Sequence, residues 1–474
     1  MAGSGIKGMR DDCAFIVEAA LDGGAQYADI RLEYNAFTSV ELRNLEVDKA
    51  NVGYNYGAGI RVAANGGWGF SSTNRLDRDS LKARMGEALK LARASSDGLR
   101  EIKLAKVKVV EDSVPFKGKM DVRDVPLDQK CSDIIEINKN VMAHDERVIL
   151  SRMTYTDFMK TKVFCSSEGA YIEMDLPEVE VNYNVTSRDK GISQWARSRE
   201  TGQLGYEFFQ HHDIEKLGRN VVEKSIDLLE GEKTPGGVFT VVIDPANVGV
   251  FIHEAFGHAN EADSVLQRRS FQYGLLETQI ASEIVTVISD PTMPYMKGSY
   301  PYDEEGTPAK EFTIIEDGIL KNYMHTRETA AELGMEPTGN ARASDYAVKP
   351  IARMNNLYIE SGDWKLEEII EDTKYGLLIE GSRGGMEDPE RGGFQLSAQN
   401  CYLIEKGEVK HPLRDVAMTG QTLDVLLSID ALADDFYLHP GHCGKGEPGI
   451  MQGAGVTDGG PHLRVGNILI GGTR

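Results

Sequence analysis

The stretch VVIDPANVGVFIHEAFGHANEAD, residues 241–263, predicts a strand that runs directly into a helix. Its β-branched start ends at Asp244, a favourable N-cap residue, and Pro245 suits the first helical position. The apolar side chains that follow recur at helical spacing, so one face of this helix is expected to pack into a core. They are Val248, Phe251, Ile252, Ala255 and Phe256.

Three reactive side chains, His253, Glu254 and His258, are predicted on the other side of this helix. The zinc helix H-E-x-x-H spaces its histidines by four residues, whereas here the step is five. In a regular α-helix that step leaves the two imidazoles about 140° apart, too divergent for one ion. A π-type turn would bring them together, and such turns concentrate at functional sites. We therefore predict a distorted helix over residues 255–258, with Gly257 supplying local backbone freedom.

Two carboxylates just downstream, Glu261 and Asp263, favour a metal site. Metal-bound imidazoles usually donate their second N–H to a carboxylate, so these two acids are candidate partners of the histidines. The simpler interpretation is that the histidines are solvated or hydrogen-bonded on the polar side of an amphipathic helix and that the acids lie on the surface. The spacing alone does not separate these interpretations.

A catalytic zinc needs about three protein ligands and one open position. The segment FYLHPGHCGKGEPG, residues 436–449, is predicted to be a glycine- and proline-rich loop, in which side chains need not serve a core. Cys443 is the strongest third ligand there because a thiolate binds zinc well, and His439 and His442 remain open alternatives. Candidates elsewhere in the C-terminal half are His325, Cys401, His411 and His462.

Composition limits the class of protein. The chain has 474 residues, enough for two or three domains, and its net charge of −22 argues against nucleic-acid or anionic-membrane partners. It has no run of 18 apolar residues, and Asp11 and Asp12 lie where a signal peptide needs an apolar core, so a cytoplasmic protein is expected. Five scattered cysteines are expected as thiols: Cys13, Cys131, Cys165, Cys401 and Cys443.

The pattern of helices and strands predicts an α+β fold. Residues 1–120 are expected to form an N-terminal two-layer region with helices packed on an antiparallel sheet, and residues 121–235 a middle α+β segment. Residues 236–474 contain short strands broken by Gly, Pro and Asp, which indicates a β-rich, sandwich- or barrel-like domain that carries the metal-binding helix. Helices are expected at 9–23, from Asp77, and at 121–144, 214–229, 327–333 and 366–372.

Five motifs are distributed over nearly the whole chain: YADIRLE (27–33), GIRVAANGGWGFSS (59–72), HEAFGHANEAD (253–263), GSRGGMEDPERGGFQLSA (381–398) and CGKGEPG (443–449). Together they resemble the TldD/PmbA family of metallopeptidases, specifically its TldD branch. The resemblance implies a zinc site formed by His253, His258 and Cys443, with Glu254 as the general base. The family's TldE branch typically lacks this metal motif, so the motif points to the active subunit.

The expected reaction is hydrolysis of short or unfolded peptides, in which zinc activates a water and Glu254 takes and returns its proton. The resemblance implies a substrate enclosed within a dimer, either a homodimer or a heterodimer with a TldE/PmbA-like subunit. Exposed strand edges can bind an extended peptide, and the glycines at 384, 385, 392 and 393 would allow close approach of its backbone.

Two other functions remain open. One is a noncatalytic peptide-binding or partner subunit with a structural zinc, and the other is a zinc amidase that acts on small molecules. The oxyanion donor is not identified by the sequence. Tyr302, Tyr323 and His325 are possible donors.

Overall fold

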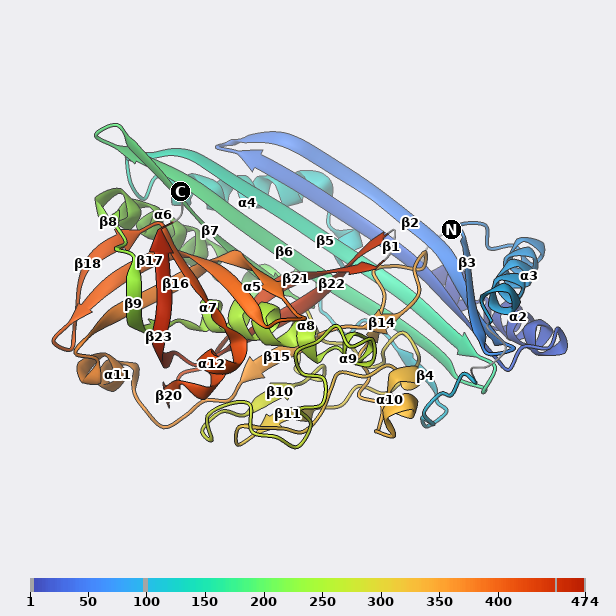
Figure 1. Ribbon diagram of the computed structural model, residues 1–474. Coiled ribbons are helices and arrows are strands. Elements are labelled where there is room, and N and C mark those ends of the chain that lie inside the picture. Colours follow the sequence, from blue (N-terminus) through green and yellow to red (C-terminus); the bar gives the residue numbers. More distant parts are fainter. Residues whose placement is uncertain (1–3, 97–100, 448–449, 473–474) are drawn as a thin grey trace.

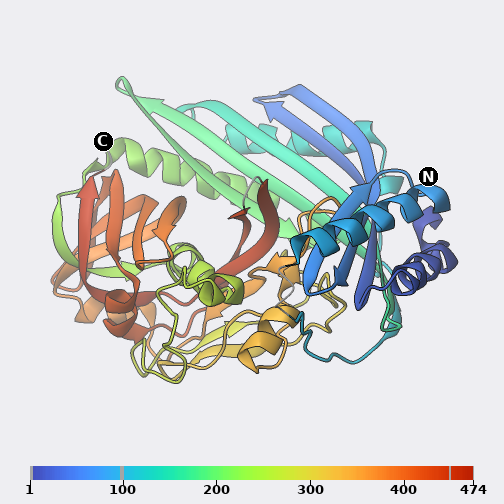
Figure 2. The ribbon, with the colours of Figure 1, turned by 45° about the vertical axis from the view of Figure 1, so that its right-hand side comes forward.

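A computed structural model describes residues 4–96, 101–447 and 450–472. It shows an α+β protein in which a long antiparallel sheet from the N-terminal half covers a C-terminal half of shorter strands (Figures 1 and 2). The predicted class, helices on an N-terminal antiparallel sheet followed by a β-rich domain, is confirmed. Within these described ranges, none of the helices is both long enough and apolar enough to cross a membrane.

The N-terminal sheet is continuous across the first two predicted segments. Its order is β3-β2-β1-β5-β6, and β4 and β7 both pair with β6. Strand β1 pairs with β5 from Asp29 opposite Ser166 to Arg43 opposite Arg152, so residues before and after 120 share one sheet. The boundary at residue 120 stays a prediction. The strands are β1 (Tyr27–Arg43), β2 (Glu46–Ala64), β3 (Gly67–Thr73), β4 (Glu111–Val114), β5 (Val148–Ser166), β6 (Tyr171–Asp189) and β7 (Ile192–Gly202).

Two pairs of helices pack on opposite ends of these long strands (Figure 1). Helices α2 (Arg10–Asp22) and α3 (Arg78–Ser95) cover the start of β1, and α4 (Leu127–Met142) and α6 (Ile214–Glu230) cover its end. Asp77 is the N-cap of α3, where its side chain accepts a hydrogen bond from the Ser80 amide; Asp79 and Ser80, the residues expected to cap this helix, lie within its first turn. The short predicted helices at α10 (Arg327–Leu333) and α11 (Leu366–Asp372) are also present.

The C-terminal half contains a closed ring of strands in the order β16-β9-β23-β19-β17, with β17 pairing back to β16. This closure confirms the barrel-like prediction. Strand β18 (Glu408–Arg414) extends the sheet beyond β17. The ring strands are β9 (Gly237–Ile243), β16 (Tyr375–Asp388), β17 (Gly393–Glu405), β19 (Val416–Gln421) and β23 (Leu463–Gly472).

A second sheet lies beside the barrel, and its edge strand corrects one prediction. Residues 437–447 form strand β21, antiparallel to β22 (Ile450–Gly460), where a loop over 436–449 was expected. An edge strand tolerates Pro440 because its N–H side need not be paired. Residues 448 and 449 lie outside the described ranges. The remaining strands, in order from β22, are β15 (Asn356–Ile359), β10 (Val287–Ser289), β11 (Phe312–Glu316) and β12 (Ile319–Leu320).

Buried ion pairs join the two halves of the molecule. The Glu304 carboxylate lies 3.2 Å from the Arg31 guanidinium and also pairs with Lys162. Glu305 pairs with Arg61 at 2.7 Å. Both glutamates lie in the segment between β10 and β11, and their partners lie on the long sheet, so these pairs hold that sheet against the C-terminal half.

Candidate metal centre

The helix that carries the histidines changes its winding along its length. It begins as α7 (Pro245–Val250), continues as the π-helical segment η2 (Phe251–Gly257) and ends as α8 (His258–Asn260). Asp244 caps it by accepting a hydrogen bond from the Asn247 amide at 2.9 Å. The predicted distortion is therefore present, and it starts earlier than residues 255–258. The five predicted apolar side chains are all buried.

Gly257 serves close packing rather than unusual backbone angles. Its φ is −63°, an ordinary helical value, so the expected backbone freedom is not what the position uses. A Cβ at this position would lie 2.2 Å from the Met354 sulfur and 3.0 Å from a Leu357 methyl. The absence of a side chain therefore lets strand β15 and its flank pack directly on the π-helical segment.

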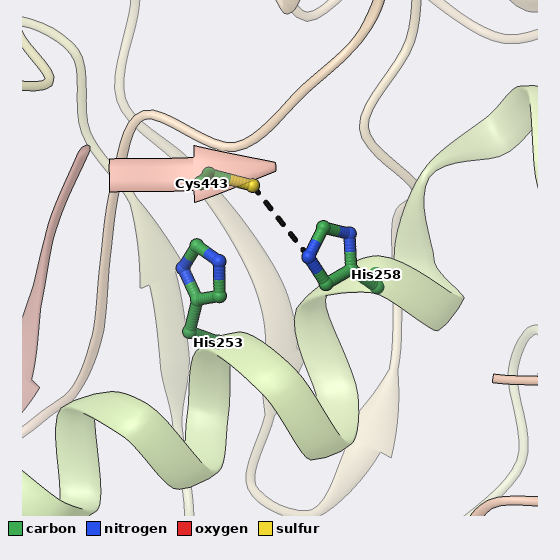
Figure 3. Close-up of side chains that lie close together, drawn as sticks. All are labelled: His253, His258 and Cys443. Atoms are coloured by element: carbon green, nitrogen blue, oxygen red, sulfur yellow. Dashed lines mark hydrogen bonds between the residues drawn. The ribbon is translucent and has the colours of Figure 1, made fainter. Parts of the chain in front are cut away.

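The π-helical winding brings the two imidazoles together with a distant thiol. His253, His258 and Cys443 each offer a ligand atom, and these atoms all lie within 4.8 Å of one another. The Cys443 Sγ is 3.5 Å from His258 Nε2, and the two imidazole centroids are 5.1 Å apart (Figure 3). All three side chains are buried. One helix and strand β21 thus present two nitrogens and one sulfur to a common point.

The open alternatives for the third ligand point elsewhere. His442 Nε2 lies 3.1 Å from the Glu180 carboxylate and 3.0 Å from Lys297 Nζ. His439 packs on the Tyr437 ring, with centroids 4.7 Å apart. The other candidates are also placed away from the cluster: His325 lies beside Thr329, His462 bonds Asp435, His411 is exposed and Cys401 is buried in the barrel core.

Each imidazole has a carboxylate on its outer nitrogen. His253 Nδ1 is 2.9 Å from Asp458, and His258 Nδ1 is 3.3 Å from Glu261. Of the two predicted acids, Glu261 thus contacts a histidine, whereas Asp263 contacts Lys445 Nζ at 2.7 Å. Lys445 also lies 3.1 Å from Glu261 and so links both acids to the strand that carries Cys443.

Asp458 was missed by the sequence reasoning. It lies on β22, opposite His439 in the β21–β22 hairpin and 205 residues beyond His253. The available signal was a carboxylate in a strand pattern just after the cysteine motif, in VTDGG. Its role could be predicted only from the pairing of β21 with β22, and the expectation of a loop at residues 436–449 excluded that pairing.

The charges of the thiol, the two imidazoles and their neighbouring carboxylates stabilise one another. Burial disfavours the thiolate of Cys443, but the facing imidazoles outweigh burial and hold the pKa of Cys443 well below its usual value of 9.0. Burial likewise opposes charge on His258, yet Glu261 and Cys443 raise its pKa to about 10. The same balance, with Asp458 as the main partner, raises the pKa of His253. The two imidazoles therefore favour the thiolate of Cys443, the form that binds metals.

Zinc fits these residues. Two imidazoles and one thiolate are preferred zinc ligands, and each imidazole has the outer carboxylate that fixes the nitrogen facing the metal. In the described part of the chain, the cluster with Cys443 contains these three donors, which is the number found in catalytic rather than structural zinc sites.

Glu254 lies beside the cluster and faces a cavity. Its carboxylate is 4.0 Å from His258 Nε2, and its side chain is 25% exposed. Burial raises the pKa of Glu254 against the opposing effect of the two histidines. The cavity has a volume of about 1190 Å³ and is lined by Glu254 and His253 together with residues of β7, α6, β16 and β21. A substrate in it would therefore reach this carboxylate.

Two of the three possible oxyanion donors are hydrogen-bonded to other partners, and the third is buried away from the cavity. The Tyr323 hydroxyl donates to the Gln272 carbonyl at 2.8 Å, and the Tyr302 hydroxyl donates to Asp112 at 2.6 Å. His325 is fully buried beside Thr329. The described residues that line the cavity include none of the three.

Comparisons with protein families cover the chain in three segments. Residues 28–95 match the model of PmbA/TldA metallopeptidase domain 1, residues 121–229 the central domain, and residues 236–472 the C-terminal domain. A protein named metalloprotease from Methanocaldococcus jannaschii is 38% identical over 440 residues, which cover 93% of this chain and 96% of that protein.

A protein named zinc metalloprotease TldD homolog from Saccharolobus solfataricus is 30% identical over 460 residues. The aligned region covers 96% of this chain and 99% of that protein. Among solved structures, TldE from Thermococcus kodakarensis aligns with a TM-score of 0.80 at 17% identity, over 97% of this chain and 100% of that one. At that identity the structural likeness concerns the fold alone.

Proposed function

The chain belongs to the PmbA/TldD family of metallopeptidases, and on that premise we propose that it is a zinc-dependent peptidase that hydrolyses short or unfolded peptides. The observation that carries this proposal is the convergence of His253, His258 and Cys443, with Glu254 adjacent to them and open to the cavity. A noncatalytic protein has no need of an accessible carboxylate beside such a cluster.

The residues around the cluster have different roles in the proposed reaction. Zinc, held by the three donors, would supply the Lewis acidity that polarises the scissile carbonyl and acidifies a water. Glu254 takes the proton of the attacking water and returns it to the leaving amine. The raised pKa of Glu254 makes its carboxylate a stronger base and its acid form more persistent at neutral pH. Asp458 and Glu261 fix the two imidazoles through their outer nitrogens.

Two alternatives use the same residues. A structural zinc would take four protein ligands, and the group of three donors in the described ranges supports the catalytic form instead. A small-molecule amidase would share the mechanism, but a cavity of about 1190 Å³ exceeds the space that a small amide fills. Hydrolysis of a mixed peptide library compared with a panel of small amides separates the two enzymes.

A dimer is part of the proposal. The likeness to a TldE fold and the TldD name of a relative support either a homodimer or a heterodimer with a TldE/PmbA-like subunit. Size-exclusion chromatography with light scattering, with and without such a subunit, distinguishes these assemblies.

The test of the reaction is Glu254→Gln. The variant is expected to keep about one zinc per chain while its peptide cleavage falls by roughly 10²- to 10⁴-fold, because the base is lost and the ligands are intact. Glu380→Gln is the matched control, since Glu380 lines the same cavity. Retained cleavage in Glu254→Gln would exclude Glu254 as the base.

A further inference from the structure

The cavity beside Glu254 brings together two sheets with different roles. It is lined by residues of the metal-binding helix, β16 and β21 and by residues of strand β7 of the long sheet. Along β7, Ala196 faces the core formed with α4 and α6. Arg197 and Arg199 line the cavity. A chain with a net charge of −22 thus places three guanidinium groups, those of Arg152, Arg197 and Arg199, in the space that holds its candidate base.

Arg197 is held in a defined position by the barrel. The Gln399 side chain, from β17, accepts a hydrogen bond from the Arg197 amide at 2.7 Å and donates to the Arg197 carbonyl at 2.9 Å. Gly381 makes room for this contact, because a Cβ there would lie 2.8 Å from the Gln399 amide nitrogen. These two hydrogen bonds join the long sheet to the barrel at Arg197, whose side chain lines the cavity.

The Arg197 guanidinium faces cations rather than a carboxylate. Burial, then the charges of Arg199 and Arg383, lower its pKa. Arg197 as a whole residue is exposed, and its charged neighbours among the described residues are arginines rather than carboxylates. Arg199, in contrast, donates a hydrogen bond from Nε to the Asn182 side-chain oxygen Oδ1 at 2.7 Å and lies 3.8 Å from Glu180. Of these three neighbouring guanidiniums only Arg199 lies close to a carboxylate in the described part of the chain, so together they form an electropositive position that a bound carboxylate would complement.

The third guanidinium strengthens this position. Arg383 stacks over the Trp195 ring at 4.6 Å, and its buried Nε has no hydrogen-bond partner. It lies on the glycine-rich part of β16, two residues before Gly385, where an added Cβ would lie 3.4 Å from the Glu254 side chain. The same strand therefore borders both the candidate base and the guanidinium cluster.

We propose that Arg197, supported by Arg199, forms a carboxylate-binding subsite that anchors one end or one acidic side chain of the peptide in the cavity. The inference rests on the proposed peptidase function and adds a substrate preference to it. A guanidinium binds a carboxylate through two parallel N–H···O bonds, which fixes orientation as well as position. The carboxylate comes either from the peptide C-terminus or from an Asp or Glu side chain, and both have the same chemistry.

The test uses matched peptides of one sequence with the zinc-loaded protein. They end in a free acid or an amide, and carry Glu or Gln at an internal position. Wild type is expected to show kcat/KM about tenfold or more higher for the carboxylate form at one of these two places, and Arg197→Gln is expected to abolish that difference. Arg188→Gln is the control, because Arg188 lies on neighbouring β6, outside the cavity, and bonds Ser193.

Binding gives a readout independent of turnover. The same peptides, labelled with a fluorophore, are titrated against Glu254→Gln and against Glu254→Gln/Arg197→Gln, and anisotropy reports the dissociation constant. Equal affinity for all peptides, or a preference for the carboxylate that survives Arg197→Gln, would overturn the subsite. Absence of any cleavage by wild type would instead refute the proposed peptidase, while the binding preference would still decide the subsite.

Discussion

At the scale of single residues, the site depends on pairs that lie far apart in the sequence. His253 and His258 come from one helix, but Cys443 and Asp458 reach them from a hairpin about 200 residues later. Cys443 could be proposed from its chemistry and its glycine-rich surroundings. Asp458 could not, because its role depends on strand pairing that no local pattern reveals.

Asp458→Asn should weaken zinc binding by about 10- to 100-fold, because the His253 imidazole loses the carboxylate that orients it. Competition with a chromophoric chelator measures the change. Asp263→Asn is the control, since Asp263 contacts Lys445 and no imidazole. Equal losses in the two variants would contradict a specific role for Asp458.

At the scale of elements, the five-residue spacing of the histidines was informative because a regular helix could not satisfy it. The π-helical segment follows from that conflict, and its length could not be predicted because neighbouring packing sets it. The expectation of a loop around Cys443 was wrong for a related reason. Glycine and proline mark loops, yet β21 is an edge strand stabilised by its pairing with β22.

Gly257→Ala should destabilise the protein by about 1–3 kcal/mol, because the added methyl group would overlap Met354 in a filled core. Thermal or denaturant unfolding measures this. The matched control is Gly86→Ala within α3, where an added Cβ has no neighbour within 4 Å and helix propensity favours alanine by up to about 1 kcal/mol. A stabilising Gly257→Ala would contradict the packing account of the π-helical segment.

At the scale of the whole molecule, amphipathic patterns predicted the helices and the general α+β class. They did not predict that β1 and β5 form one sheet across two expected segments, or that this sheet closes a cavity over the metal-binding helix. Both features depend on contacts between residues more than a hundred positions apart. The buried pairs of Glu304 belong to this scale, since they join the sheet to the C-terminal half.

Glu304 should make that junction sensitive to acid. Burial raises the pKa of its carboxyl group, but Lys162 and Arg31 outweigh burial and lower it to about 2. Since this pKa lies below the unfolded value of about 4.3, the stabilisation is fully present above that value and is lost as the pH falls toward 2. The contribution is on the order of 3 kcal/mol.

Glu304→Gln should therefore unfold more easily than wild type at pH 7, and the difference should shrink as the pH falls from about 4.3 toward 2. Burial and the neighbouring Glu305 raise the pKa of Asp303 to about 8, so Asp303 has the opposite effect on the pH dependence of stability. Asp303 is present in both proteins, and the comparison with wild type therefore cancels its effect. Glu316→Gln, at an exposed position on β11, is the control. A difference independent of pH would contradict the ion-pair account.

The most direct test of the central claim is X-ray absorption at the zinc edge of the purified protein, with Cys443→Ser beside it. The account predicts about one zinc per chain with two imidazoles, one sulfur at about 2.3 Å and one further light atom, and loss of the sulfur shell in Cys443→Ser. A zinc without sulfur, a third imidazole, or protein that binds no zinc would contradict it.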